Sequence, residues 1–153
     1  MSVASALLPM EISGSYTFNA LPERVWNLLM DPAVLSSCIP GCETFEPSGE
    51  DRYTVTLNVG IAAITGTYTG NVHLVDKMPH TSYRLVVEGK GRPGFVKGSS
   101  TIALSADGER TEVTVTSNVQ TGGIIARVGQ RLIDGVAKMM MDRFFGCLQS
   151  KLN

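Results

Sequence analysis

The chain lacks an excess of charge of either sign, and charged residues of both kinds are scarce. Its 153 residues include 13 Lys and Arg against 14 Asp and Glu, and charged residues make up 18% of the total. Proteins that bind nucleic acid neutralise its phosphates with a clustered basic excess. The composition therefore argues against a nucleic-acid partner.

Long hydrophobic runs are also missing. Arg, Lys, Asp, Thr or Gly interrupts every apolar stretch, well short of the ~20 residues that a membrane-spanning helix needs. The first residues lack the basic region of a secretory signal peptide. We interpret residues 1–9 as a disordered lead-in and residues 10–153 as a single domain, because a chain of this length suits one hydrophobic core.

Cysteine is rare as well, with only Cys38, Cys42 and Cys147. An odd number of cysteines without a secretion signal predicts free thiols and a cytoplasmic location. The spacing of Cys38 and Cys42 occurs in zinc sites, but a structural zinc site needs two further ligands, and the histidines supply no ligand pair nearby. No metal site is therefore predicted, and Cys147 is expected in the core.

Recognisable catalytic motifs are absent too. No Ser-His-Asp or Cys-His arrangement carries a local signature. Residues 89–94 match the G-x-G-x-x-G pattern of dinucleotide sites. That site requires a helix directly after the glycines, whereas a strand pattern follows here. We therefore predict no catalytic residue and interpret residues 89–94 as a tight strand connection.

The chain is rich instead in small aliphatic residues, since hydrophobic residues make up 43% but aromatic residues only 7%. This balance favours a β-rich domain with an adaptable interior. Helical periodicity predicts short helices over residues 22–30 and 32–38 and a long amphipathic helix over residues 123–152. Alternation predicts strands over residues 10–19, 42–48, 51–59, 64–77, 81–91, 94–106 and 110–121.

These elements define an α+β fold. We expect a seven-stranded, curved antiparallel sheet around the long C-terminal helix, with the two short helices after the first strand closing one end. Gly70, Gly89 and Gly98 lie inside predicted strands, where glycine marks bends and bulges. A single helix across a strongly bent sheet leaves space that medium-sized aliphatic side chains do not fill. An apolar cavity between sheet and helix is therefore expected.

Several runs of residues resemble one known family. Together they cover nearly everything from Met10 to the C-terminal end, and they resemble the CoxG proteins associated with carbon monoxide dehydrogenase. That family belongs to the helix-grip superfamily (SRPBCC, START-like), with START lipid carriers, polyketide cyclases and the birch-pollen allergen type. The runs are Met10–Phe18, Pro22–Trp26, Cys38-Ile-Pro-Gly-Cys42-Glu43, Gly66–Gly70, Gly89–Gly91 and Gly122–Leu132.

The resemblance implies a non-catalytic accessory protein of a carbon monoxide dehydrogenase-type molybdenum hydroxylase. Its cavity would bind a hydrophobic molecule such as a quinone, an isoprenoid or another lipid, and no other cofactor is implied. We also expect transient contact with the inner face of the membrane. Two alternatives stay open: an enzyme of the polyketide cyclase or lyase kind, and an assembly or recruitment factor for the dehydrogenase.

Strand parity and helix position select the residues that would bind the ligand. Tyr53 and Tyr68 are candidates for hydrogen bonds to a ligand carbonyl, because a mostly apolar pocket orients its ligand with a few polar groups. Tyrosines bonded to backbone are the alternative for both. Lys90, Arg92 and Lys97 concentrate positive charge that would face a membrane or an acidic partner, unless they form a solvated hairpin tip. The predicted lining consists of Trp26, Met30, Leu35, Ile39, Tyr53, Leu57, Tyr68, Val87, Ile125, Val128 and Leu132.

Overall fold

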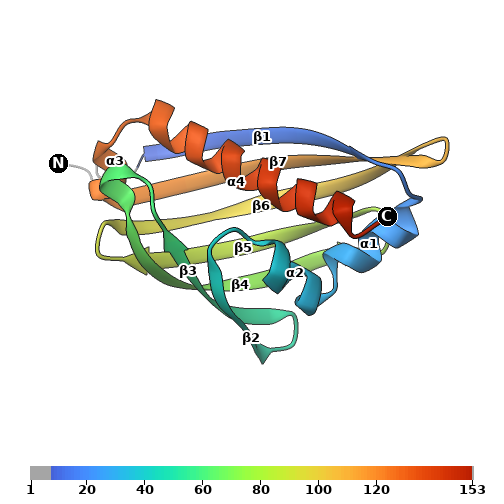
Figure 1. Ribbon diagram of the computed structural model, residues 1–153, viewed down its shortest axis with the longest axis horizontal. Coiled ribbons are helices and arrows are strands. Elements are labelled where there is room, and N and C mark those ends of the chain that lie inside the picture. Colours follow the sequence, from blue (N-terminus) through green and yellow to red (C-terminus); the bar gives the residue numbers. More distant parts are fainter. Residues whose placement is uncertain (1–7, 153) are drawn as a thin grey trace.

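A computed structural model describes residues 8–152 of the chain. Seven antiparallel strands form a single sheet in the order β1-β7-β6-β5-β4-β3-β2 (Figure 1), as the alternation predicted. The first and last strands therefore pair although they lie far apart in the sequence. The strands are β1 (Leu8–Phe18), β2 (Cys42–Gly49), β3 (Arg52–Val59), β4 (Gly66–Met78), β5 (Ser82–Gly91), β6 (Gly94–Asp107) and β7 (Arg110–Gly123).

Two short helices, α1 (Pro22–Leu29) and α2 (Pro32–Cys38), follow β1 and cover one end of the sheet. Each begins with a proline, whose missing N–H has no helical partner at that position in any case. The Asp31 carboxylate caps α2 by accepting a hydrogen bond from Ala33 N at 3.0 Å. The predicted lead-in lies largely outside the described residues, and β1 already begins at Leu8.

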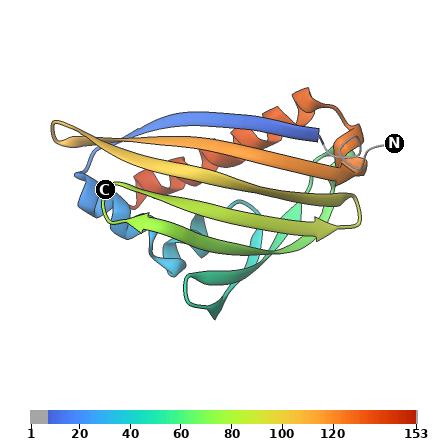
Figure 2. The same cartoon turned by 180° about the vertical axis from the view of Figure 1, so that it is seen from behind.

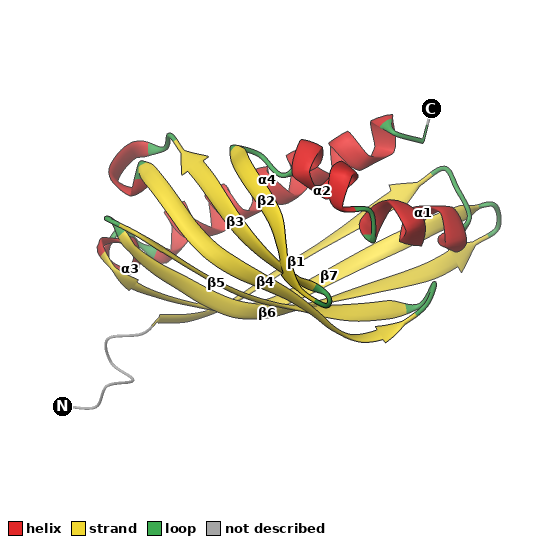
Figure 3. Cartoon of the chain, turned by 90° about the horizontal axis from the view of Figure 1, so that it is seen from below, coloured by secondary structure: helices red, strands yellow, loops and turns green. Residues whose placement is uncertain are grey.

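The prediction of one continuous helix over residues 123–152 is wrong. The segment forms two helices, α3 (Ile124–Arg127) and α4 (Gln130–Ser150). Gly129 between them has a φ of 96°, outside the helical region and in the range that favours glycine. Only α4 crosses the concave face of the sheet, on the same side as α1 and α2 (Figure 3). A short 3₁₀ helix, η2 (Ala62–Ile64), also precedes β4.

The sheet bends sharply at two glycines. An added Cβ at Gly70 would lie 2.0 Å from Glu88 O, and one at Gly98 would lie 2.2 Å from Asn118 O. Neighbouring backbones approach too closely at these positions for any side chain. The predicted role of the glycines inside strands as bend positions is confirmed at Gly70 and Gly98.

The opposite, convex face of the sheet carries no helix within residues 8–152 (Figure 2). No helix in this part of the chain is long and apolar enough to cross a bilayer. Any chamber between layers must therefore lie on the concave side, between the sheet and α4.

Candidate ligand-binding site

The concave face carries alternate residues of each strand, because successive side chains point to opposite faces of a sheet. The strand register aligns Tyr53, Val72 and Val87 across β3, β4 and β5. The same row continues through Gly98 and Val119 of β6 and β7. Residues from five strands thus meet on one surface opposite α4.

One half of this face is filled by a hydrophobic core, which we call the closed half. Phe145 and Leu148 of α4 are buried there with Phe18 of β1. Trp26 of α1 lies edge-on to Tyr83, with ring centroids 5.5 Å apart. The core also contains Leu74, Ile102, Leu104, Val113 and Val115. The closed half therefore holds α1 and the C-terminal end of α4 against the sheet.

The other half, which we call the open half, is not filled. Leu57, Tyr68 and Val87 face the concave side but are partly exposed, whereas Tyr83 on the same strand as Val87 is 3% exposed. A groove of about 480 Å³ opens beside η2, along the first half of α4. Its lining is mostly apolar and consists of Ile61, Arg131, Leu132, Gly135, Val136 and Met139.

The residues predicted to line one cavity do not all lie together. Tyr53, Leu57, Tyr68 and Val87 share the concave face, and Leu132 lines the groove. These five residues surround the open half.

The remaining predicted lining residues lie elsewhere. Trp26 is 7% exposed within the core, and Ile125 of α3 is 3% exposed. Val128 forms the C-terminal cap of α3 and is partly exposed. The other three, Met30, Leu35 and Ile39, are partly buried beside α1 and α2. The short helices and the first half of α4 thus occupy opposite ends of the molecule, because α1 and α2 pack against the C-terminal end of α4 (Figure 1).

The two predicted polar tyrosines are partly occupied by the protein itself. The Tyr68 hydroxyl donates a hydrogen bond to Ile64 O at 2.6 Å, and burial raises the pKa of Tyr68. The Tyr53 ring stacks on Phe45, with centroids 4.5 Å apart. Tyr68 therefore follows the alternative interpretation of a tyrosine bonded to backbone.

A polar pair that was not predicted from the sequence lies at the boundary between the two halves. Ser100 of β6 and Ser117 of β7 are cross-strand neighbours, and their hydroxyl oxygens are 2.6 Å apart. Strand parity could have found them, since Ser117 alternates with the predicted inward residues Val113, Val115 and Val119. Serine was overlooked because only aromatic hydroxyls were considered on the inward face.

The concave face has no ionisable group other than tyrosine along β3 to β7. The charged residues of β5 and β6, such as Arg84, Glu88 and Lys97, point to the convex face and border a separate hollow there. No group of three or more His, Cys, Asp or Glu residues within 8–152 could hold a metal ion. The open half is therefore apolar, with hydroxyl groups as its polar component.

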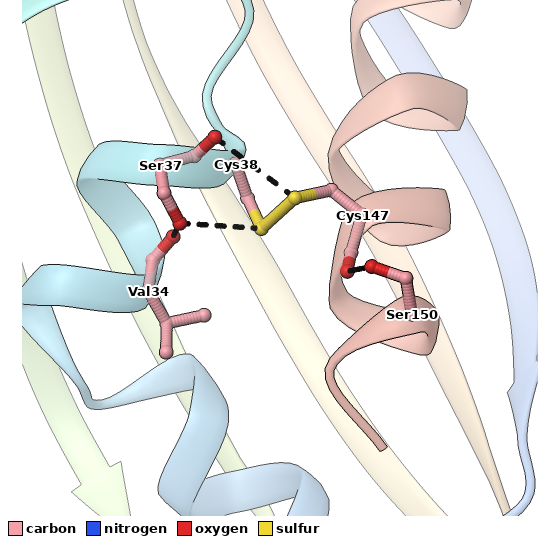
Figure 4. The surroundings of a disulfide bond; sticks show 5 residues. All are labelled: Val34, Ser37, Cys38, Cys147 and Ser150. Atoms are coloured by element: carbon pink, nitrogen blue, oxygen red, sulfur yellow. Dashed lines mark hydrogen bonds between the residues drawn. A yellow bond between two sulfur atoms is a disulfide. The ribbon is translucent and has the colours of Figure 1, made fainter. Parts of the chain in front are cut away.

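The expectation of three free thiols is wrong. Cys38 of α2 and Cys147 of α4 form a disulfide (Figure 4). They are 109 positions apart in the sequence, and the packing of α2 against α4 brings their Cα atoms to 5.4 Å. Cys42 is a free cysteine, and burial raises the pKa of its thiol, opposed by a smaller effect of a hydrogen bond with Ser36.

The predicted basic residues lie on the outside of the sheet. Lys90 and Arg92 are exposed at the β5–β6 connection. Lys97 is exposed on the convex face and borders the hollow of about 650 Å³ there. These side chains are available to a partner but do not reach the concave side.

A curved antiparallel sheet that holds one long helix in its concavity, with two short helices at one end, defines a helix-grip fold of the Bet v 1-like type. A model of the CoxG family, whose description assigns it to carbon monoxide dehydrogenase, matches residues 14–153. The chain therefore belongs to the CoxG family. A comparison with curated proteins found no match.

Solved structures agree on the fold. A conserved protein from Geobacillus kaustophilus is 40% identical with a TM-score of 0.90, covering 93% of this chain and 94% of its own. An aromatase/cyclase from Streptomyces is 17% identical with a TM-score of 0.67, covering 94% and 93%. Norcoclaurine synthase from Thalictrum flavum, in complex with dopamine and hydroxybenzaldehyde, is 13% identical with a TM-score of 0.69, covering 99% and 92%. At such identities the last two share the fold alone.

Proposed function

We propose that this protein binds a neutral hydrophobic molecule, such as a quinone, an isoprenoid or another lipid, between the sheet and α4 without converting it chemically. The observation that carries the proposal is the open half, where inward-facing side chains are partly exposed and none is ionisable apart from tyrosine. A neutral ligand needs apolar contact and a few hydrogen-bonding groups rather than charge. Leu132, Val136 and Met139 supply apolar contact, and methionine adapts to ligands of different shape.

Membership of the CoxG family supports an accessory role beside a molybdenum hydroxylase of the carbon monoxide dehydrogenase type. In this role the protein carries its ligand between the membrane and the dehydrogenase, touching the membrane only transiently. Because two of the three cysteines are paired, cysteine usage no longer argues for the cytoplasm. The location at the inner face of the membrane rests on the proposed partner.

Native mass spectrometry tests the ligand proposal. The protein is expressed in a quinone-producing bacterium, purified without detergent and analysed intact, and the bound material is extracted and identified. We expect a fraction of the molecules to carry a quinone or another neutral lipid. A protein that is consistently empty and shows no affinity for added quinone would contradict the proposal.

The first alternative is an enzyme of the polyketide cyclase or lyase kind, a reaction class known for proteins with this fold. General acid–base chemistry requires a titratable group within hydrogen-bond reach of the substrate. On the described concave face only tyrosine hydroxyls qualify, and burial raises the pKa of Tyr68 and Tyr83, away from the neutral range where a base is useful. The site therefore favours binding over catalysis.

The second alternative is a recruitment factor that docks the dehydrogenase through the basic connection. The exposure of Lys90 and Arg92 on the convex side favours this alternative. The variant Lys90→Glu with Arg92→Glu would then abolish co-purification with the dehydrogenase while quinone binding stays intact. Unchanged co-purification would remove this alternative.

A further inference from the structure

From the placement of one serine pair we infer that Ser100 and Ser117 are the polar anchor of the cavity, which binds a carbonyl or hydroxyl oxygen at the inner end of an elongated ligand. This inference rests on the proposed binding function. It adds which residues recognise the ligand and which end of the ligand enters first.

The pair lies where the filled core ends. On the side of the closed half, the next inward residues of the two strands are Ile102 and Val115, which are 4% and 5% exposed. On the side of the open half, the next inward residue of β6 is Gly98, which has no side chain to cover the pair. Ser100 is accordingly partly exposed, while Ser117 is only 7% exposed. The hydroxyls therefore face the open half from its inner boundary.

The hydrogen-bond arithmetic leaves a donor without a partner in the described protein. Two serine hydroxyls offer two O–H donors, and either can donate in the single bond of 2.6 Å between them. Neither hydroxyl has a second partner among residues 8–152. The Tyr68 and Thr111 hydroxyls, by contrast, donate to the backbone carbonyls of Ile64 and Ala20. The serine pair can thus donate one hydrogen bond to a ligand and accept others.

These groups select the chemistry of the ligand end. A carbonyl oxygen accepts the free O–H, and a hydroxyl both donates to and accepts from the pair, so a quinone and its reduced form both fit. No cationic side chain of β3 to β7 faces this side, so a carboxylate or phosphate would be buried without a counter-charge. Six residues separate Ser100 from Gly94 at the end of β6, about 20 Å along a strand. The ligand must therefore be elongated, with a neutral oxygen-bearing end inside and an apolar body extending toward α3.

Binding of two matched compounds tests the inference. Decylubiquinone carries ring oxygens, and decylbenzene has a similar ring and tail without them. We expect the double variant Ser100→Ala with Ser117→Ala to bind decylubiquinone about 3- to 10-fold more weakly, the effect of one lost hydrogen bond. Its affinity for decylbenzene stays unchanged. The variant Ser99→Ala, on the convex face of the same strand, is the matched control and keeps both affinities.

A spectroscopic readout separates recognition from a merely structural role. A hydrogen bond to a quinone carbonyl weakens the C=O bond, so its infrared stretching band lies at lower wavenumber in the wild type than in the double variant. The variant with Thr at both positions restores the hydroxyls and the lower band. Equal decylubiquinone affinity and an identical band in wild type and double variant would overturn the serine anchor while leaving the binding function intact. A wild-type protein that binds neither compound would overturn both proposals.

Discussion

The sulfur atoms of Cys38 and Cys147 are bonded to each other, and this disulfide joins the short helix α2 to the C-terminal half of α4. The same region contains the core around Phe145 and Leu148. No comparable link holds the first half of α4 within the described residues, where Leu132 and Val136 are partly exposed. The two ends of one helix thus have different tasks, since one fixes the fold and the other borders the groove.

The first prediction concerns this disulfide. Replacing Cys147 by serine releases a cross-link between residues 109 positions apart, so the unfolded chain gains conformational freedom. We expect the free energy of unfolding to fall by about 2–4 kcal/mol, measured by urea denaturation. Cys42→Ser is the matched control and should change stability by less than about 1 kcal/mol, because Cys42 forms no disulfide.

Thiol titration provides an independent check of the pairing. Under denaturing conditions without reductant, one thiol per chain should react in the wild type and none in the Cys42→Ser variant. After reduction, three thiols should react in the wild type, matching its three cysteines. Three reactive thiols before reduction in protein purified without reductant would contradict the disulfide.

The second prediction concerns Tyr16 of β1. Its hydroxyl donates a hydrogen bond to Asp142 Oδ1 at 2.7 Å, and its ring stacks on Phe145. Burial, then the hydrogen bond and the charge of Asp142, raise the pKa of Tyr16 from 10.0 to about 12. Because the folded pKa exceeds the unfolded one, the stabilisation is fully present below pH 10 and is lost as the pH rises through about 12.

An ultraviolet titration of tyrosinate in wild type and Tyr16→Phe identifies this residue by difference. We expect the missing component to be the one that titrates near pH 12. Asp142→Asn removes the carboxylate charge and should lower the pKa of Tyr16 while leaving the stacked ring in place. A Tyr16 component at the ordinary tyrosine pKa in the wild type would contradict the Tyr16–Asp142 contact.

The sheet was predictable from the sequence because a strand with one buried face alternates, and the alternation is clear from β3 to β7. The break at Gly129 was not, because Val128 and Leu132 continue the apolar stripe of a single helix across it. The Cys38–Cys147 pair was equally hidden, since only the packing of α2 against α4 brings the two cysteines together. Periodicity describes one element at a time, whereas these features depend on how two elements meet.

The candidate site shows the same limit. Parity placed Tyr53, Leu57 and Val87 on the concave face, but it gives no information on which half of that face is filled. Trp26 was expected at the opening and lies in the core, because α1 packs beside Tyr83. The position of the groove depends on where α4 is anchored, and this is a tertiary property.

The third prediction concerns the bend at Gly98. Alanine at this position places a Cβ 2.2 Å from Asn118 O, so β6 and β7 must separate. We expect Gly98→Ala to lower the free energy of unfolding by about 1–3 kcal/mol. Gly146→Ala is the contrast, because an added Cβ in this exposed part of α4 meets no atom within 4 Å. It should stabilise the protein by up to about 1 kcal/mol through the higher helix propensity of alanine. Equal effects of the two variants in urea denaturation would contradict the close strand approach.

The last prediction concerns the groove. Val136 lies on α4 among the groove-lining residues, and tryptophan there fills much of a space of about 480 Å³. We expect Val136→Trp to reduce the affinity for decylubiquinone and decylbenzene alike by at least about tenfold, since the bulk excludes the apolar body common to both. Isothermal titration calorimetry measures this without interference from the new indole.

Lys138→Trp adds the same side chain at an exposed position of α4 and should leave both affinities unchanged. Thermal unfolding of both variants shows whether the fold is kept. Unchanged binding by a folded Val136→Trp variant would mean that the ligand does not occupy this groove. The pattern also differs from that of the serine variant, which should weaken only the oxygen-bearing compound. Together the two variants distinguish exclusion of the apolar body from loss of the polar anchor.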